Sequence, residues 1–144
     1  MKKVLVTGGA GFIGSHLVTS LVERGFQVRV LDNLSTGSRD NLAHVRDSVD
    51  FVEGAIEDEK VCRSTFDGVR YLWHLAALGS VPRSLRDPLT TNRANVDGTL
   101  TVLWAARQMG VERVVFASSS SVYGTNGNGK QDISDLPRPS SPYA

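Results

Sequence analysis

Short apolar runs alternate with longer amphipathic segments along most of the chain. The runs are rich in valine and leucine, a composition that is typical of strands buried on both faces of a parallel sheet. Glycine, proline and polar residues separate them from the amphipathic segments. The pattern predicts five strands, at residues 4–6, 27–31, 49–52, 69–75 and 113–117.

Helical spacing of apolar residues predicts three helices between these strands. The first covers residues 13–22 and stops before Gly25, and the second is a charged segment at residues 57–66. The third runs from about Leu89 to Met109, and Gly110 ends it. We expect its apolar face to be formed by Val96, Leu100, Leu103 and Trp104.

Strands that alternate with helices predict a parallel sheet covered on both faces. Right-handed crossovers make this a doubly wound α/β fold, the Rossmann fold, with the expected strand order 3-2-1-4-5. One domain accounts for residues 1–144. Loops are expected around Pro82 and Pro88, before the third helix, and in the glycine- and asparagine-rich stretch from Gly124 to Gly129.

Charge and cysteine content narrow the classes of partner. The formal net charge is +1, so bulk electrostatics favour neither nucleic acid nor a membrane surface. Cys62 is the only cysteine, which excludes an internal disulfide and a cysteine-based zinc site, and we expect no metal site. We predict that Cys62 is a small buried core residue in a protein of a reducing, cytoplasmic compartment.

A glycine-rich turn follows the first strand. Gly8, Gly11 and Gly14 have the spacing G-x-x-G-x-x-G, and Phe12 and Ile13 open the helix after it. The first glycine permits a tight turn, the second lets the backbone approach a pyrophosphate, and the third lets helix and strand pack closely. The helix N-terminus would then present N–H groups to the phosphates. This context, strand then turn then helix, predicts a dinucleotide site.

Two residues at the end of the second strand predict which dinucleotide binds. Asp32 follows the glycine turn at the distance where a carboxylate accepts hydrogen bonds from the hydroxyls of a ribose. It would repel a 2′-phosphate, and Asn33 stands where an NADP-dependent enzyme would place an arginine. The expected cofactor is therefore NAD. The alternative role of Asp32 is to cap the turn that follows it.

These features, together with several later motifs in the same order, make the chain resemble the extended short-chain dehydrogenase/reductase family, the sugar-nucleotide epimerases and dehydratases. The resemblance covers essentially the whole chain and is closest to the subgroup of UDP-sugar 4-epimerases. Beyond the glycine turn and Asp32-Asn33, its motifs are His74-Leu75-Ala76-Ala77, Asn95-Val96-Asp97-Gly98-Thr99, Ser118 to Gly124, and Ser141-Pro142-Tyr143-Ala144.

The resemblance implies a set of cofactor contacts. In the family, the backbone after the fourth strand lines the adenosine and pyrophosphate, a helix asparagine braces the site, and the side chain of the strand-end histidine belongs to the core. The implied cofactor-binding residues are Gly8, Gly11, Phe12, Ile13, Gly14, Asp32, Asn33, Ile56, Leu75, Ala76, Ala77, Asn95, Ser118 and Tyr143.

One position departs from the family pattern. The family often carries an acidic residue after the third strand that bonds the adenine amino group, and Ala55 stands there in this chain. The missing hydrogen bond would cost about 1 kcal/mol of NAD binding. Glu53 and Asp58 are the candidates for compensation that the sequence offers.

The resemblance also implies a catalytic pair. Tyr143 matches the tyrosine that removes a proton from a sugar hydroxyl while hydride leaves for the nicotinamide. Ser119 matches the hydroxyl residue that bonds the same sugar oxygen, with Ser118, Ser120 and Ser121 as alternatives. In the family a lysine four positions beyond the tyrosine assists it. The implied substrate contacts are Ser80, Ser119, Ser120 and Tyr143.

The neighbours of Ser119 favour one reaction of the family. Its 4,6-dehydratases carry Asp-Glu immediately after the catalytic hydroxyl residue, and its UDP-glucuronate decarboxylases carry Glu two residues after it. Ser120 and Ser121 occupy these positions here and are not acids or bases at neutral pH. The resemblance therefore implies a UDP-hexose or UDP-N-acetylhexosamine 4-epimerase. The alternatives are a dehydratase or reductase of the same family, and a non-catalytic NAD-binding module.

The segment from Gly79 to Ser84 resembles enzymes that act on UDP-N-acetylhexosamines or their uronic acids in surface-polysaccharide synthesis. The sequence stops one residue after Tyr143, so we expect an N-terminal piece that lacks the last strands and the C-terminal substrate domain. We expect this piece to be inactive alone and to expose its fifth strand. The resemblance implies a homodimer for the full-length protein, built partly on the third helix.

Overall fold

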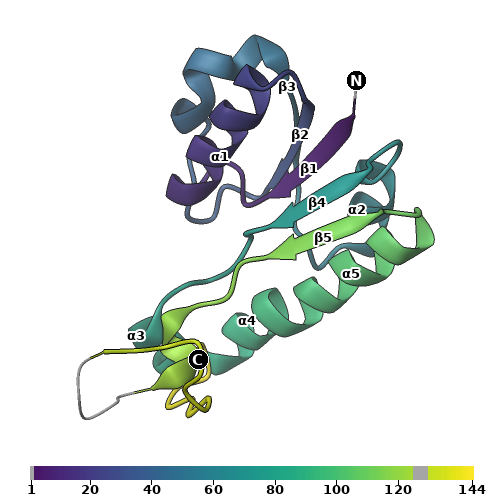
Figure 1. Ribbon diagram of the computed structural model, residues 1–144. Helices are drawn as coiled ribbons and strands as arrows, with labels where there is room; N and C mark the ends of the chain where they lie inside the picture. The colour runs from purple at the N-terminus through teal and green to yellow at the C-terminus, as the bar shows by residue number, and fades with distance from the viewer. Residues whose placement is uncertain (1, 125–129) are drawn as a thin grey trace.

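The computed structural model describes residues 2–124 and 130–144. The predicted loop from Gly124 to Gly129 therefore lies outside the described residues, apart from Gly124. Five parallel strands form one sheet in the order β3-β2-β1-β4-β5 (Figure 1). This confirms the predicted doubly wound fold and strand order. The strands are β1 (Lys3–Thr7), β2 (Gln27–Asp32), β3 (Val49–Glu53), β4 (Tyr71–His74) and β5 (Arg113–Phe116).

The helices agree with the predicted positions and add elements that the apolar pattern did not reveal. The predicted helices correspond to α1 (Phe12–Glu23), α2 (Glu59–Thr65) and a run formed by α4 (Pro88–Asn92), the π-helical turn η2 (Arg93–Asp97) and α5 (Gly98–Gln108). The predicted loop around Pro82 is instead a short helix, α3 (Val81–Arg86), whose first turn contains that proline. Two 3-10 segments, η1 (Arg39–Ser48) and η3 (Ser120–Tyr123), were also not predicted.

Two apolar clusters cover the two faces of the sheet. Alternate residues of each central strand point to opposite faces, so Leu5 belongs to one cluster while Val4 and Val6 belong to the other. The cluster around Leu5 includes Phe66 and packs α2 and α5 on the sheet. The cluster around Val4 packs α1 and η1 on the opposite face (Figure 1). The sheet therefore lies between two helical layers, and the last residues of its central strands, Thr7, Asp32 and His74, are buried.

The predicted apolar face of the third helix does not pack on the sheet. Val96, Leu100, Leu103 and Trp104 are exposed, between 40% and 68% of their surface. The face on the sheet is formed instead by Gly98, Val102, Ala105 and Ala106. Small side chains let α5 approach the sheet closely, and the larger apolar residues remain on the outer face.

The edge of the sheet that β5 forms is exposed to solvent. All four residues of β5 are exposed, and Val115 and Phe116 keep 45% and 56% of their surface. β5 is the edge strand, as predicted. Apart from η3, the described residues after it are irregular and mostly exposed (Figure 1). Among the described residues, no helix combines the length and the apolar character that crossing a membrane requires.

Candidate functional site

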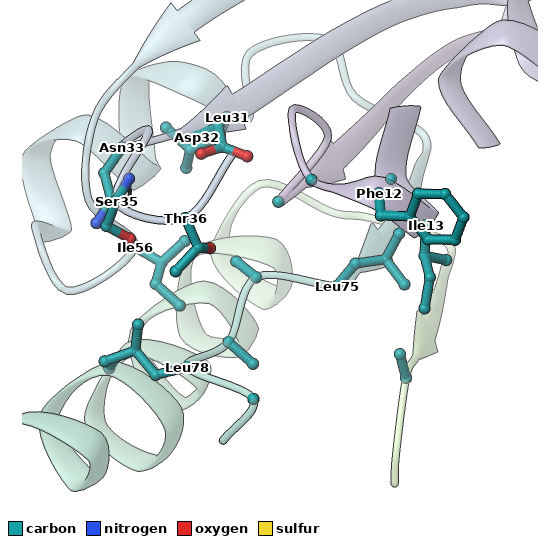
Figure 2. Close-up of a pocket in the computed structure, with 18 of the residues that line it drawn as sticks. Phe12, Ile13, Leu31, Asp32, Asn33, Ser35, Thr36, Ile56, Leu75 and Leu78 are labelled. Carbon is teal, nitrogen blue, oxygen red and sulfur yellow. Dashed lines mark hydrogen bonds between the residues drawn. The ribbon is translucent and has the colours of Figure 1, made fainter. Parts of the chain in front are cut away.

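A cavity of about 360 Å³ lies at the carboxyl ends of β1, β2 and β4, where open parallel sheets bind their ligands. Figure 2 shows its labelled side chains, with Asn33 and Ser35 at one side and Phe12 and Ile13 at the other. Of the sequence-predicted cofactor residues, it brings together Gly8, Gly11, Phe12, Ile13, Gly14, Asp32, Asn33, Ile56, Leu75, Ala76, Ala77, Ser118 and Tyr143.

The turn between β1 and α1 is packed so closely that its glycines cannot be replaced without movement. A Cβ on Gly14 would overlap the carbonyl oxygen of Gly8 and lie 2.7 Å from the Cα of Gly9. A Cβ on Gly11 would meet only the Gly8 oxygen, at 3.3 Å, so its absence keeps the approach from the cavity open. Gly11 is also the N-cap of α1, and no side chain caps this helix. The first-turn N–H groups are thus available to an anion.

Asp32 is held in a fixed orientation at the end of β2. The residue is 8% exposed. Its Oδ2 accepts a hydrogen bond from the Ala10 N–H at 2.9 Å, and its Oδ1 accepts one from the Leu34 N–H at 2.8 Å. Asp32 therefore does cap the turn, but its carboxylate can still accept further hydrogen bonds. Each oxygen has a second lone pair that can accept from a ligand hydroxyl.

His74 is a core residue that connects the ends of β1 and β4. Its Nδ1 lies 2.6 Å from Thr7 Oγ1, and its Nε2 lies 3.0 Å from Thr99 Oγ1. Thr7 Oγ1 also accepts from the N–H groups of Leu75 and Ala76, so its own proton is directed to Nδ1. The imidazole of His74 is then in the neutral tautomer that carries its hydrogen on Nε2.

Burial lowers the pKa of His74 from 6.5 to about 4, so the imidazole stays neutral at physiological pH. The prediction that this side chain belongs to the core is confirmed, and its two ring nitrogens lie within hydrogen-bond distance of threonine hydroxyls. The network holds the backbone of Leu75 and Ala76, which lines the cavity, against Thr7, the residue that leads into the glycine turn.

Asn95 does not line the cavity but contacts a residue that does. Its Oδ1 accepts from the Leu78 N–H at 2.8 Å, and its Nδ2 donates to the Leu78 carbonyl at 3.3 Å. Leu78 lines the cavity and Asn95 does not. The asparagine therefore braces the loop after β4, and its predicted role at a cofactor site stays a prediction.

Neither carboxylate that the sequence offered as compensation for Ala55 faces the cavity. Glu53 is exposed and pairs with Arg39, with an N–O distance of 3.0 Å. Asp58 is the N-cap of α2 and accepts from two backbone N–H groups of that helix. The carboxylate between them in sequence that does line the cavity is that of Glu57, which the sequence reasoning missed.

The predicted catalytic and substrate residues are only partly brought together. Ser118 and Tyr143 line the cavity, and a Cβ on Gly79 would lie 3.5 Å from the Tyr143 hydroxyl oxygen. Ser119 lies outside the lining and caps η3, where its Oγ accepts from the Ser121 N–H at 3.2 Å. Ser80 caps α3 by accepting from the Arg83 N–H, and Ser120 begins η3.

Other lining residues were missed because they depend on the arrangement of strand ends rather than on a motif. Parallel register brings the residues after β2, β3 and β4 to one edge, and that rule could have found most of them. The missed residues are Leu31, Ser35, Thr36, Gly54, Glu57, Leu78, Gly79, Ala94 and Ala117.

Cys62 lies beneath the site and takes no part in it. It is fully buried in α2, and its thiol donates to the Ile56 carbonyl at 3.2 Å. Burial, together with the nearby carboxylates of Asp58 and Glu57, raises the pKa of this thiol to about 12. The thiol is therefore protonated and unreactive at neutral pH, as the prediction of a core cysteine requires.

Comparison with known proteins gives a consistent result. Residues 4–144 match the model of the NAD dependent epimerase/dehydratase family. A UDP-glucose 4-epimerase of Erwinia amylovora is 43% identical over 129 residues, which are 85% of this chain and 38% of that protein. The chain thus spans less than half the length of the curated relatives it matches.

The solved structures that resemble this chain include both epimerases and dehydratases. The UDP-glucose 4-epimerase of Thermus thermophilus, in complex with NAD, superposes with a TM-score of 0.91 at 43% identity, over 98% of this chain and 46% of that one. A dTDP-glucose 4,6-dehydratase from Streptomyces venezuelae, also with NAD, gives a TM-score of 0.92 at 40% identity, over 98% and 47%. The fold alone does not separate the two reactions.

Proposed function

The chain belongs to the NAD dependent epimerase/dehydratase family, and we propose that it forms the NAD-binding part of a sugar-nucleotide 4-epimerase. The observation that carries the proposal is one cavity lined by the glycine turn, the Asp32 carboxylate and Tyr143. The first two fit a dinucleotide, and the third supplies a group that can exchange a proton with a sugar hydroxyl.

The residues of the cavity fit two polar parts of NAD, the pyrophosphate and the adenosine ribose. The uncapped N-terminus of α1 and the open space at Gly11 suit the pyrophosphate. The oriented Asp32 carboxylate suits the adenosine ribose, and a 2′-phosphate there would meet a buried negative charge. When bound, NAD supplies the acceptor and later the donor of a hydride.

In the proposed reaction, the protein's own groups handle the proton and the sugar oxygen. Tyr143 takes the proton of the sugar 4-hydroxyl and later returns it. A serine hydroxyl bonds the same oxygen. Ser119 has this role by family resemblance, and Ser118 is the alternative because it lines the cavity. Ser119 accepts one hydrogen bond through its Oγ, which leaves its own proton free to donate.

Epimerisation is preferred to dehydration because of the two residues that come after the catalytic serine. Ser120 and Ser121 stand where a dehydratase of the family carries Asp-Glu, and hydroxyls do not perform that acid–base work at neutral pH. A 4-epimerase needs only oxidation, rotation of the 4-keto intermediate and hydride return. The proposed substrate is a UDP-hexose or a UDP-N-acetylhexosamine, with a role in polysaccharide synthesis.

Turnover is proposed for the full-length protein rather than for these 144 residues, because the relatives are more than twice as long. A homodimer is also proposed, through the outer face of α5. Leu100, Leu103 and Trp104 leave an apolar strip exposed there, and such strips mark interfaces. The lone, buried thiol of Cys62 fits the reducing cytoplasmic compartment that the proposal includes.

A thermal melt of the purified chain with NAD, and separately with NADP, tests the cofactor assignment. A ligand at 100 times its Kd stabilises the folded state by about 2.7 kcal/mol, so NAD is expected to raise Tm by several degrees. NADP is expected to leave Tm almost unchanged. A cooperative melt that NAD does not move would refute the cofactor assignment. Detectable epimerase turnover by the 144-residue chain would refute the proposal that turnover requires the rest of the protein.

A further inference from the structure

Glu57 carries a buried carboxylate oxygen with no partner. Among the described residues, its Oε2 is the one buried side-chain nitrogen or oxygen for which the structure gives no hydrogen bond. An acceptor removed from water without a donor costs free energy, and more so when it is charged. Such a site is expected to gain a donor from a ligand.

The position of Glu57 restricts what that ligand can be. The residue lies in the loop between β3 and α2 and lines the cavity beside Ile56. A Cβ on Gly98 would lie 3.4 Å from Glu57 Cγ, so the start of α5 supports the side chain from behind. The Glu57 side chain therefore lies against the start of α5, with its Oε2 removed from solvent.

The neighbouring strand end indicates which part of NAD reaches Glu57. Asp32, which suits the adenosine ribose, is paired in register with Glu53 at the end of β3. The loop after β3 therefore lies on the far side of the ribose from the glycine turn, where the base of the nucleotide must lie. Adenine offers one exocyclic donor, its 6-amino group, and an ionised carboxylate is a pure acceptor.

The other carboxylates of this loop have partners. Glu53 is paired with Arg39, and Asp58 caps α2. Ala55 has no polar side chain to offer the base. Among the described carboxylates of the loop, Glu57 alone combines a place on the cavity with an unused acceptor.

We propose that Glu57 accepts a hydrogen bond from the adenine 6-amino group of NAD and replaces the acidic residue that the resembling family often has at the position of Ala55. The proposal rests on the proposed function, since it requires NAD in this cavity. It makes Glu57 a determinant of base specificity. A base with a carbonyl at position 6 would direct a lone pair at the carboxylate and would be repelled.

The test compares two dinucleotides by isothermal titration calorimetry: NAD, and its hypoxanthine analogue, in which a 6-oxo group replaces the amino group. The proteins are wild type, Glu57→Gln and, as matched control, Glu59→Gln. Glu59 is exposed in the first turn of α2 and does not line the cavity, so the control removes the same charge nearby. The Tm of each protein without ligand checks that it is folded.

Wild type is expected to bind NAD about tenfold or more tightly than the hypoxanthine analogue, the size of a charged hydrogen bond. Glu57→Gln should lose most of that preference, because it weakens NAD binding and no longer repels the 6-oxo group of the analogue. Glu59→Gln should keep the preference. Adding Ala55→Asp to Glu57→Gln should restore it. A variant that weakens both dinucleotides equally, or neither, would overturn the role of Glu57 while leaving the NAD site intact. Failure of wild type to bind either dinucleotide would overturn the proposed function as well.

Discussion

The region around β1 and α1 differs sharply from β5 and the segment after it. Four of the five residues of β1 are buried, while all four of β5 are exposed. The turn after β1 is fixed by backbone contacts that leave no room for a Cβ at Gly14. The segment after β5 leads to Ser119, which caps a single 3-10 turn. The proposed cofactor-binding half of the site is thus built into the core, whereas the proposed catalytic half lies on a weakly enclosed edge.

This contrast implies that the same kind of substitution has unequal effects in the two regions. Residues of the first region should couple stability to cofactor binding, because the same atoms serve both. Residues of the second should affect chemistry with little effect on folding. Substitutions and pH changes chosen in each region can separate these two kinds of behaviour.

The largest expected effect is that of Gly14→Ala. The new Cβ would overlap the Gly8 carbonyl oxygen, so the glycine turn must shift, at a cost of about 3 kcal/mol or more. Gly25→Ala is the control. Gly25 lies just after α1, has open space around it and has a φ of +78°, so its cost should be about 1 kcal/mol. Urea unfolding gives both values, and equal costs would contradict the close packing of the turn.

A second large effect is expected from pH. His74 titrates with a pKa of about 4 in the folded chain and 6.5 as its ordinary value. Between these values the unfolded chain binds the extra proton, so stability rises with pH through this window and is lost as pH falls. The loss from pH 7 to pH 4 is about 3 kcal/mol. Tm measured across that range should fall steeply for wild type and less for His74→Asn. Parallel curves would rule out His74 as the source.

A matched pair of substitutions compares the two regions directly. Val30 in β2 is fully buried, and Val115 in β5 keeps 45% of its surface. Val30→Thr buries a hydroxyl in an apolar cluster and should cost about 2 kcal/mol. Val115→Thr retains a β-branched side chain in a solvated position and should change stability by less than about 0.5 kcal/mol. Chemical unfolding of both variants checks this, and a costly Val115→Thr would mean that β5 is covered in solution.

The sequence predicted the buried region well because its signals are local. Parallel strands appear as apolar runs such as Val4-Leu5-Val6, and a turn that must avoid side chains appears as Gly8, Gly11 and Gly14. Asp32 was identified for the same reason, since its distance from the turn is set by one βαβ unit.

The features that were missed depend on contacts between distant segments. An apolar stripe on α5 does not say which face meets the sheet, and the small residues around Ala105 took that place. Proline in a first helical turn is easily taken for a loop, which concealed α3. Glu57 has no motif, and its relevance appears only when the ends of β2 and β3 are seen side by side.

The smallest effect on stability, and the sharpest separation of folding from chemistry, is expected from Tyr143→Phe. Among the described residues, the structure gives no hydrogen bond to the Tyr143 hydroxyl, which faces the cavity beside Gly79. Its removal should change the free energy of unfolding of the chain by less than about 0.5 kcal/mol. In the full-length protein the same change should reduce epimerase turnover by at least about 100-fold, because a proton-transfer group is lost. Unfolding curves and turnover assays measure the two effects separately. A destabilised chain with turnover reduced only in proportion would make Tyr143 a packing residue, and the difference between the two regions would then be one of burial alone.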